Sequence, residues 1–228
     1  MAGMKLLKEW LVKHPVLKTL DEPGYSTFLA HAVRRDLQKG EALALQGDIW
    51  PYLLLVAEGE VDAVKMSSEG RSLVVTTFSA GDLFWGPAFF QKDAPLLATL
   101  ETHFPTCIYL WPRHRIESVF IANGRMSWEL CCLMIQRMQR ASAIVEELAF
   151  QPIARRLASH LLGHFESAGN DSIRRHLTLD EMAARVGTTR EMVCRALYIF
   201  ADNKFINITR TEFVLTDRAG LAKIAGGS

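Results

Sequence analysis

Apolar residues between positions 177 and 200 recur at the spacing expected for two short helices. The first helix has an apolar face made of Leu179, Met182, Ala183 and Val186. The pattern stops at Gly187, a residue type that readily adopts the left-handed backbone of a tight turn. Either Thr188 or Thr189 can cap the second helix. That helix has its own apolar face, made of Met192, Val193, Ala196, Leu197 and Phe200. The pattern predicts a helix, a turn and a second helix.

Charged residues at the start of the second helix are expected to face outward: Arg190, Glu191 and Arg195. In a helix-turn-helix the first turns of the second helix enter the major groove, where arginine bonds guanine and glutamate accepts from cytosine. Residues 205–215 then form two short apolar runs around a polar turn, which is typical of a β-hairpin. Together these elements predict a winged helix that reads DNA. The helix pair alone leaves an ordinary helical hairpin with a solvated charged face open.

The first 120 residues have a different pattern, in which short apolar runs are separated by turns that contain glycine. Their β-branched and aromatic content is typical of strands. The expected strands cover residues 52–56, 61–65, 73–78, 96–100 and 107–111. A helical segment over residues 5–12 precedes them. We expect an antiparallel sandwich or roll.

Residues 125–150 contain neither glycine nor proline, and they predict one long helix with two apolar stripes. One stripe has alternating steps of three and four: Trp128, Cys131, Ile135, Met138, Ser142, Val145 and Ala149. The other stripe contains Leu130, Met134, Arg137, Ala141, Ile144 and Leu148. One face can pack on a partner helix and the other on the chain's own sheet, which favours a homodimer. A core helix within a single subunit is the alternative.

These patterns predict an α+β protein with three parts: an effector-type β-roll domain (1–124), a dimerisation helix and hinge (125–150), and a winged helix (151–228). The formal net charge is +1, with +3 in residues 151–228 and −2 in the remainder. This mild asymmetry agrees with DNA contacts by a few arginines rather than indiscriminate coating. No apolar run is long enough for a membrane span, and the N-terminus lacks the apolar core of a secretory signal. We expect a cytoplasmic protein without membrane contact.

The chain carries no sequence signature of an enzyme or of a cysteine framework. The four cysteines, Cys107, Cys131, Cys132 and Cys194, lack disulfide or metal-ligand spacing and are expected to be reduced thiols. The adjacent pair Cys131 and Cys132 leaves a redox-sensing role open. An interaction module without DNA binding is a further alternative, although the outward arginines favour DNA.

The order of roll, long helix and winged helix resembles the cyclic-AMP receptor protein / fumarate-nitrate regulator (CRP/FNR) family of bacterial transcription regulators. The resemblance rests on spaced motifs: Gln46-Gly47-Asp48, Glu69-Gly70, Gly81-Asp82-Leu83-Phe84, Leu148-Ala149-Phe150 and the segment 189–195. It implies a homodimer that binds double-stranded DNA and has RNA polymerase as a partner. It also implies a TGTGA-like half-site that is read by Arg190, Glu191 and Arg195, with Thr178 and Thr189 as phosphate contacts. Cys194 departs from the small glycine or serine usual at its position.

The effector pocket departs further from the cyclic-AMP branch of that family. There a glycine and a glutamate follow the Gly-Asp motif, and an Arg-Ser pair ten residues later binds the cyclic phosphate. Here the corresponding residues are Trp85, Gly86, Leu96 and Leu97. A buried phosphate without a cationic partner is strongly unfavourable, so we expect that cyclic AMP is not the effector. Ser142 resembles the helix residue that touches adenine, but a serine on a helix is more often explained by packing.

The metal-containing branches do not match either. The iron-sulfur branch has several cysteines near its N-terminus, whereas this chain has none before Cys107. The haem branch ligates iron at positions that here are Trp85 and Pro87, neither of which binds iron. No cofactor and no metal are therefore expected. His103 with Cys107 could form a private haem or redox ligand pair, but a surface histidine beside a buried cysteine is favoured.

The remaining effector-pocket candidates are apolar and aromatic: Phe84, Trp85, Phe89, Leu96, Leu97, Met138 and Ser142, with Phe90, Met134 and Arg137 near them. Two hypotheses follow. Either these side chains fill the roll and the protein binds DNA without an effector, or they line a site for an apolar or aromatic metabolite. The first is slightly favoured because Trp85 stands where the cyclic-AMP branch has glycine.

Overall fold

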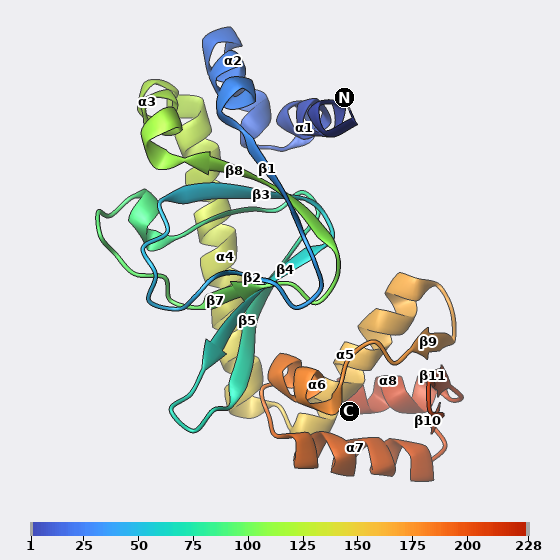
Figure 1. Cartoon of the computed structure of the whole chain (residues 1–228). Coiled ribbons are helices and arrows are strands. Elements are labelled where there is room, and N and C mark those ends of the chain that lie inside the picture. The colour runs from blue at the N-terminus through green and yellow to red at the C-terminus, as the bar shows by residue number, and fades with distance from the viewer. Residues whose placement is uncertain (1, 227–228) are drawn as a thin grey trace. The chain divides into compact units, whose positions relative to one another are not determined.

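The computed structural model describes residues 2–226, which form two compact units (Figure 1). One unit comprises the chain up to Lys65 together with Val75–Arg140, and the other comprises Met66–Val74 together with the chain from Ala141 onward. Helix α4 (Gly124–Phe150) contributes to both units. The first unit is mainly β-sheet and the second mainly helical, so the expected α+β class is confirmed.

The strands of the first unit form two four-stranded sheets. In the first sheet the order is β1 (Val33–Leu37), β8 (Thr106–Pro112), β3 (Tyr52–Glu58) and β6 (Leu83–Trp85), with antiparallel neighbours. In the second sheet the order is β2 (Ala42–Ala44), β7 (Thr99–Glu101), β4 (Glu60–Met66) and β5 (Ser72–Ser79). Each of the five predicted strands overlaps one of these, although β7 covers only the end of its predicted range.

Strand β3 shows why the central strands are continuous apolar runs. Leu54 and Val56 point into the core between the two sheets, whereas Leu53 and Leu55 point to the opposite face and pack with helices. Successive side chains of a strand face opposite sides, so a strand that is covered on both sides needs apolar residues throughout. In register, Leu54 lies opposite Leu110 of β8.

Helices cover the outer face of the first sheet. They are α1 (Ala2–Lys13), η1 (Leu17–Thr19), α2 (Glu22–His31), η2 (Pro87–Phe89), α3 (Arg113–Ala122) and the first part of α4. Phe28 and Trp111 anchor this core, with ring centroids 5.3 Å apart, and the Trp111 indole donates to the Phe28 carbonyl at 2.7 Å. The helix predicted over residues 5–12 is confirmed as α1, whereas α2 and α3 were not predicted.

The second unit contains four short or medium helices and a small sheet within the described residues (Figure 1). The helices are α5 (Ile153–Ala168), α6 (Leu179–Val186), α7 (Arg190–Asp202) and α8 (Arg218–Gly226). The strands are β9 (Ser172–Arg174), β10 (Ile206–Ile208) and β11 (Glu212–Leu215), in the order β10-β11-β9. Antiparallel pairing of Ile206 with Leu215 confirms the predicted hairpin. The two helical faces and this hairpin share one core, which also includes Leu157, Leu161 and Phe165 of α5.

Two histidines are held neutral by their surroundings. Burial lowers the pKa of His14 to about 4, with Asp82 opposing the shift and Arg137 adding to it. Its Nδ1 accepts a backbone hydrogen bond from Val16 at 3.1 Å, which a protonated Nδ1 could not do. Burial, assisted by the charges of His164 and Arg185, lowers the pKa of His160 to about 3.

Both units should therefore lose stability in mild acid. An unfolded histidine binds a proton near pH 6.5, whereas these folded imidazoles do so only at much lower pH, so stability falls as pH drops below about 6.5. From about pH 7.5 to about pH 5.5, we expect each histidine to lower the free energy of unfolding by about 1–2 kcal/mol. Tryptophan fluorescence during urea unfolding reports the first unit, and hydrogen exchange of α5 amides reports the second.

His14→Gln and His160→Gln should flatten the pH dependence of their own unit. His114 is exposed on α3, so His114→Gln serves as the control and should leave the slope unchanged. Equal slopes in all four proteins would contradict this account.

Candidate nucleic-acid interface

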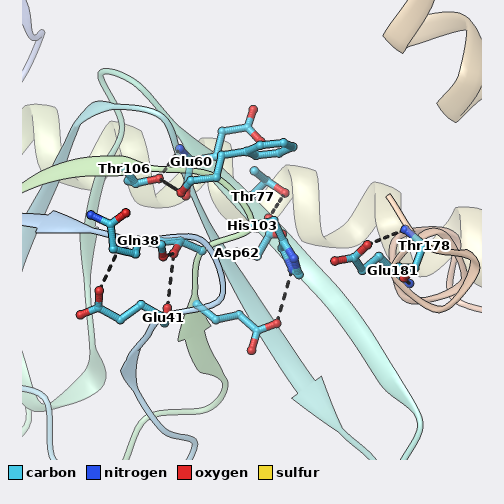
Figure 2. A network of polar contacts seen from close by, with 12 residues as sticks. Gln38, Glu41, Glu60, Asp62, Thr77, His103, Thr106, Thr178 and Glu181 are labelled. Atoms are coloured by element: carbon cyan, nitrogen blue, oxygen red, sulfur yellow. Dashed lines mark hydrogen bonds and ion pairs between the residues drawn. The ribbon is translucent and has the colours of Figure 1, made fainter. Parts of the chain in front are cut away.

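The helix-turn-helix is defined by caps at three successive points. Thr178 caps α6, where its hydroxyl accepts from the Glu181 amide at 3.2 Å and the Glu181 carboxylate accepts from the Thr178 amide at 2.5 Å (Figure 2). This reciprocal capping box satisfies two free N–H groups. Helix α6 ends at Gly187, and Thr189 caps α7 by accepting from the Met192 amide at 3.4 Å. Of the two predicted cap candidates, Thr189 is the one used.

Gly187 is required for two physical reasons. Its φ of 68° and ψ of 49° place it in the left-handed region, where residues with a Cβ are strained. A Cβ at this position would also collide with the side chain of Leu148, near the end of α4. Glycine is therefore the residue that fits this tight turn with the least strain.

The three predicted base-reading residues lie at the exposed start of α7. The side chains of Arg190, Glu191 and Arg195 are each about two-thirds exposed. Arg190 forms an ion pair with Asp180 at 3.4 Å, and Arg195 pairs with Glu191 one turn earlier. Exposed ion pairs contribute only about 0–1 kcal/mol. Both arginines can therefore exchange these partners for DNA at little cost.

The two predicted phosphate contacts lie at helix N-termini. Thr178 and Thr189 are exposed, and each hydroxyl oxygen accepts a backbone N–H of its own helix. The hydroxyl proton of each remains available to donate. A helix N-terminus also carries partial positive charge, so the surroundings of both threonines suit a phosphate oxygen.

Arg156 of α5 holds the turn and was not identified from the sequence. Its Nε donates to the Val186 carbonyl at 2.9 Å and its Nη2 to the Gly187 carbonyl at 3.2 Å, both at the end of α6. Its Nη1 donates to the Gln151 carbonyl at 2.6 Å, just after α4. One guanidinium thus satisfies carbonyls that the helix ends leave free. These partners are up to 31 residues away, so no local sequence pattern could indicate them.

The wing contributes a further cation that the sequence analysis did not single out. Arg210 lies exposed in the turn between β10 and β11. Arg175 supports this turn, because it donates to the Thr209 carbonyl at 3.0 Å and lies 5.1 Å from the Phe213 ring centroid. A rigid turn with an exposed arginine is suited to contact a DNA backbone.

Helix α4 exposes its first predicted stripe and part of its second, in which Met134 and Leu148 are also exposed. Leu130 of the second stripe is buried in the core of the first unit. The first stripe is exposed in the single chain, most clearly at Trp128 (70%), Met138 (67%) and Val145 (66%), and also at Cys131, Ile135 and Ser142. A row of exposed large apolar side chains on one helix is typical of a protein interface.

The effector-pocket candidates do not all gather at one place. Phe89 and Leu96 are buried. Leu96 packs closely on Gly86, because a Cβ at Gly86 would lie 3.0 Å from its side chain. Phe84 and Trp85 are partly exposed on β6. Leu97 is 63% exposed on the surface of the chain, and Met138 and Ser142 are exposed on α4.

Arg137 of α4 lies against the aromatic residues of the roll. Its guanidinium carbon is 4.6 Å from the centroid of the Trp85 ring and 5.2 Å from that of Phe78. Its Nη2 donates to the Leu83 carbonyl. Burial lowers the pKa of Arg137 to about 10, partly offset by the Asp82 carboxylate. The helix that carries the exposed apolar stripe is thus joined to strand β6 by this side chain.

The expectation that His103 lies on the surface is wrong. Its side chain is only 17% exposed, with Nε2 3.4 Å from the buried carboxylate of Asp62 and 3.5 Å from Glu101 (Figure 2). Asp62 also accepts from the Thr77 hydroxyl at 2.5 Å. The cross-strand network draws His103 inward because Asp62 and Glu101 face each other in register on β4 and β7.

The buried cysteine, Cys107, is not an activated thiol. Cys107 is buried as expected, and burial raises the pKa of its thiol to about 11, away from the thiolate that metal or redox chemistry needs. Cys131 is exposed, Cys132 and Cys194 are partly exposed, and all four are free. Within residues 2–226 no group of three or more His, Cys, Asp and Glu side chains is arranged to hold a metal ion. No helix in the described part of the chain is long and apolar enough to span a bilayer.

Comparison with known proteins identifies both units. A family model described as a Crp-like helix-turn-helix domain matches residues 155–224, and one for a cyclic nucleotide-binding domain matches residues 34–123. The "CRP-like cAMP-activated global transcriptional regulator" of Mycobacterium tuberculosis is 23% identical over 195 residues, covering 83% of this chain and 87% of that protein. The "cAMP-activated global transcriptional regulator Vfr" of Pseudomonas aeruginosa is 23% identical over 212 residues, covering 88% and 95%.

Solved structures show the same fold. FixK2 from Bradyrhizobium japonicum has a TM-score of 0.70 at 20% identity, covering 86% of this chain and 98% of that one. The c-di-GMP responsive global regulator CLP of Xanthomonas campestris has a TM-score of 0.73 at 21% identity, covering 86% and 99%.

Arg156→Met should loosen the helix-turn-helix. The change leaves the Val186, Gly187, Gln151 and Glu147 carbonyls without their charged donor, so we expect a loss of about 1–3 kcal/mol in the second unit. Hydrogen exchange of the α6 and α7 amides measures this loss. Arg174 is exposed on β9, and Arg174→Met is the matched control, expected to change exchange little. Similar exchange rates in the two variants would contradict the role assigned to Arg156.

Proposed function

Because the chain belongs to the CRP/FNR superfamily of transcription regulators, we propose that it binds a TGTGA-like palindrome as a homodimer and is not controlled by cyclic AMP. The observation that carries this proposal is the exposed start of α7, where Arg190, Glu191 and Arg195 are held only by surface ion pairs. Arg195 and Arg190 suit guanine in the major groove, and Glu191 suits cytosine. Thr178 and Thr189 are proposed to bind phosphates that set the register of the protein on the duplex.

Dimerisation is supported by the exposed stripe on α4, for which we propose Trp128, Cys131, Ile135, Met138, Ser142 and Val145 as the interface. Two copies of α4 that pack along this stripe remove the apolar side chains from water. A two-fold dimer also presents two copies of α7, which a palindrome with two half-sites requires. With α4 as the dimerisation helix, we propose three parts of the chain: a roll domain (1–124), the dimerisation helix and hinge (125–150), and the winged helix (151–228).

Control by cyclic AMP is not expected, although the two relatives described above are named as cAMP-activated. Leu96 is buried against Gly86, and the ring of Trp85 contacts Arg137. Apolar and aromatic side chains therefore stand at positions that bind the nucleotide in the cyclic-AMP branch. A cyclic phosphate placed beside Leu96 and Leu97 would have no cation there. The contact between Trp85 and Arg137 supports the first hypothesis, in which the roll is filled by its own side chains and needs no effector. The partly exposed rings of Phe84 and Trp85 support the second, in which an aromatic ligand binds there.

A redox- or haem-responsive regulator has less support. His103 is engaged by Asp62 and Glu101, and the Cys107 thiol has a raised pKa. Cys131 lies on the proposed interface and Cys132 beside it, so these thiols fit packing. A regulator of this kind needs no catalytic machinery, acts on chromosomal DNA in the cytoplasm, and has RNA polymerase as its proposed partner.

Replacing Arg195 by alanine should weaken binding to the proposed operator by about 1–3 kcal/mol and relax the preference for the base pair that it contacts. Fluorescence anisotropy of the ligand-free protein measures this, with a TGTGA palindrome and a scrambled duplex at one fixed salt concentration.

The control is Lys223→Ala on α8, which removes one positive charge from an exposed site of the same unit. It should weaken both duplexes by a similar small amount. Equal binding of the unmodified protein to both duplexes, or an equal loss in the two variants, would count against base reading by Arg195.

Replacing Ile135 by aspartate should dissociate the dimer. A charge buried at the centre of an apolar interface is expected to weaken self-association by about a hundredfold or more. Analytical ultracentrifugation measures the association. Ile121 is exposed at the end of α3, outside the stripe, so Ile121→Asp is the control and should stay dimeric. If the unmodified chain sediments as a monomer at micromolar concentration, α4 is not the interface.

A further inference from the structure

Tyr198 is a large aromatic residue that the fold of the second unit does not use. Its side chain is 76% exposed on α7, and it makes no hydrogen bond or ring contact with any described residue. Phe200, two residues later, is fully buried, so the apolar face of α7 is complete without Tyr198. A single exposed ring is common on protein surfaces, so its position decides whether it has a role.

The position of Tyr198 continues the row of proposed base-reading side chains. Residues three, four or seven positions apart lie on one side of a helix. Tyr198 comes three residues after Arg195 and seven after Glu191, and all three side chains are exposed. With a rise of about 1.5 Å per residue, Tyr198 lies about 4.5 Å beyond Arg195 along the helix axis. This step is close to the spacing of about 3.4 Å between stacked base pairs.

The surroundings of Tyr198 favour a base edge over a phosphate. Cys194 lies one turn before it and is partly exposed, and a free thiol behaves as a small apolar group. Asp202 lies one turn after it, is exposed, and forms no ion pair with any residue that the structure describes. A carboxylate at this place repels a phosphate that would accept a hydrogen bond from the Tyr198 hydroxyl. The ring and the thiol together offer an apolar surface.

The composition of α7 leaves adenine without its usual reader. Asparagine and glutamine are the side chains that bond adenine at two positions, and the helix sequence, Arg-Glu-Met-Val-Cys-Arg-Ala-Leu-Tyr-Ile-Phe-Ala-Asp, contains neither. An A·T pair within reach of α7 can be read from its other base instead. Thymine carries a C5 methyl group in the major groove, and apolar side chains recognise that group by contact.

We propose that Tyr198 reads the C5 methyl group of a thymine beside the base pair bound by Arg195. The inference rests on the proposed function, because it requires α7 to enter the major groove. Loss of one buried methyl group weakens binding by about fourfold. A cytosine methylated at C5 presents the same surface, so the contact also distinguishes methylated from unmethylated cytosine at this position.

Fluorescence anisotropy with base-modified duplexes tests the contact. The operator is first selected by the full chain from a pool of random duplexes, so the test does not depend on the TGTGA prediction. Each thymine is then replaced by deoxyuridine at the same place in both half-sites, which removes only the C5 methyl groups. We expect one thymine position to respond, with binding weaker by about tenfold or more at a fixed salt concentration. At this position, 5-methylcytosine should bind more tightly than cytosine by a similar factor.

Two variants assign the response to the Tyr198 ring. Tyr198→Ala should bind the thymine and deoxyuridine operators equally, whereas Tyr198→Phe keeps the ring and should retain the full preference. Both changes are at an exposed site, so we expect the fold to tolerate them. Ile121 is an exposed apolar residue of α3, and Ile121→Ala is the control that should keep the preference of the unmodified protein.

Three results would overturn the role of Tyr198: no thymine that responds to loss of its methyl group, an unchanged preference in Tyr198→Ala, or a lost preference in Tyr198→Phe. The last would assign the contact to the hydroxyl. Selection of an operator unlike TGTGA, or tight binding of cyclic AMP, would sink only the proposed function, because the same tests on the selected operator still judge Tyr198. Failure to select any sequence from the pool would overturn both.

Discussion

Helix α4 buries apolar residues of its first two turns in the core of the first unit, whereas a stripe of large apolar side chains along its length stays exposed in the single chain. Leu130 and Met126 are buried against the first sheet and its helices, whereas Trp128, Ile135 and Val145 remain in water. Burial of apolar surface contributes roughly 25 cal/mol per Å². Covering an exposed stripe of this kind is therefore favourable, and this is the physical basis for the dimer proposed above.

The start of α7 is held in place by hydrogen bonds that a few residues make to the backbone. The capping box at Thr178 starts α6, the left-handed Gly187 ends it, and Arg156 binds the carbonyls that remain free at that end. Thr189 then starts α7 in a new direction. Each contact satisfies backbone groups that would otherwise be unpaired, so the turn is fixed without help from the residues that face outward. Arg190, Glu191 and Arg195 take no part in fixing the turn, so these exposed side chains are available for contacts outside the chain.

The sequence pattern predicted the elements whose apolar residues are periodic and local. The α6–α7 pair, the β10–β11 hairpin, α1, α4 and the central strands all follow from such patterns. Strand β1 was not predicted, because four of its five residues are exposed and its sequence, Val-Arg-Arg-Asp-Leu, lacks a buried alternation. Helix α3 starts with Arg-His-Arg and buries only Ile116 and Phe120, which gives a weak helical stripe.

The same distinction between local pattern and long-range contact applies to the site residues. The outward positions of Arg190 and Arg195 could be read from the helical period, whereas their role in base reading stays a prediction. Arg156 and His103 owe their positions to partners distant in sequence, namely the end of α6 and the facing strands β4 and β7. The sequence alone favours a surface position for His103, because its contacts with Asp62 and Glu101 form only when strands β4 and β7 pair. Long-range polar contacts are therefore the part that single-sequence reasoning misses.

The two groups of arginines in this chain differ in a way that separates their physical roles. Arg190 and Arg195 are exposed and already paired with carboxylates, so solvent and mobile ions stabilise their charge in any state of the protein. Arg137 is largely buried between aromatic rings and has a backbone carbonyl instead of a carboxylate. If stability alone had shaped the roll, an apolar side chain of similar length at this position would avoid the desolvation of a charge. The charge of Arg137 is instead used within the chain, because the guanidinium lies against the Trp85 and Phe78 rings and donates to the Leu83 carbonyl, and these contacts join β6 to α4.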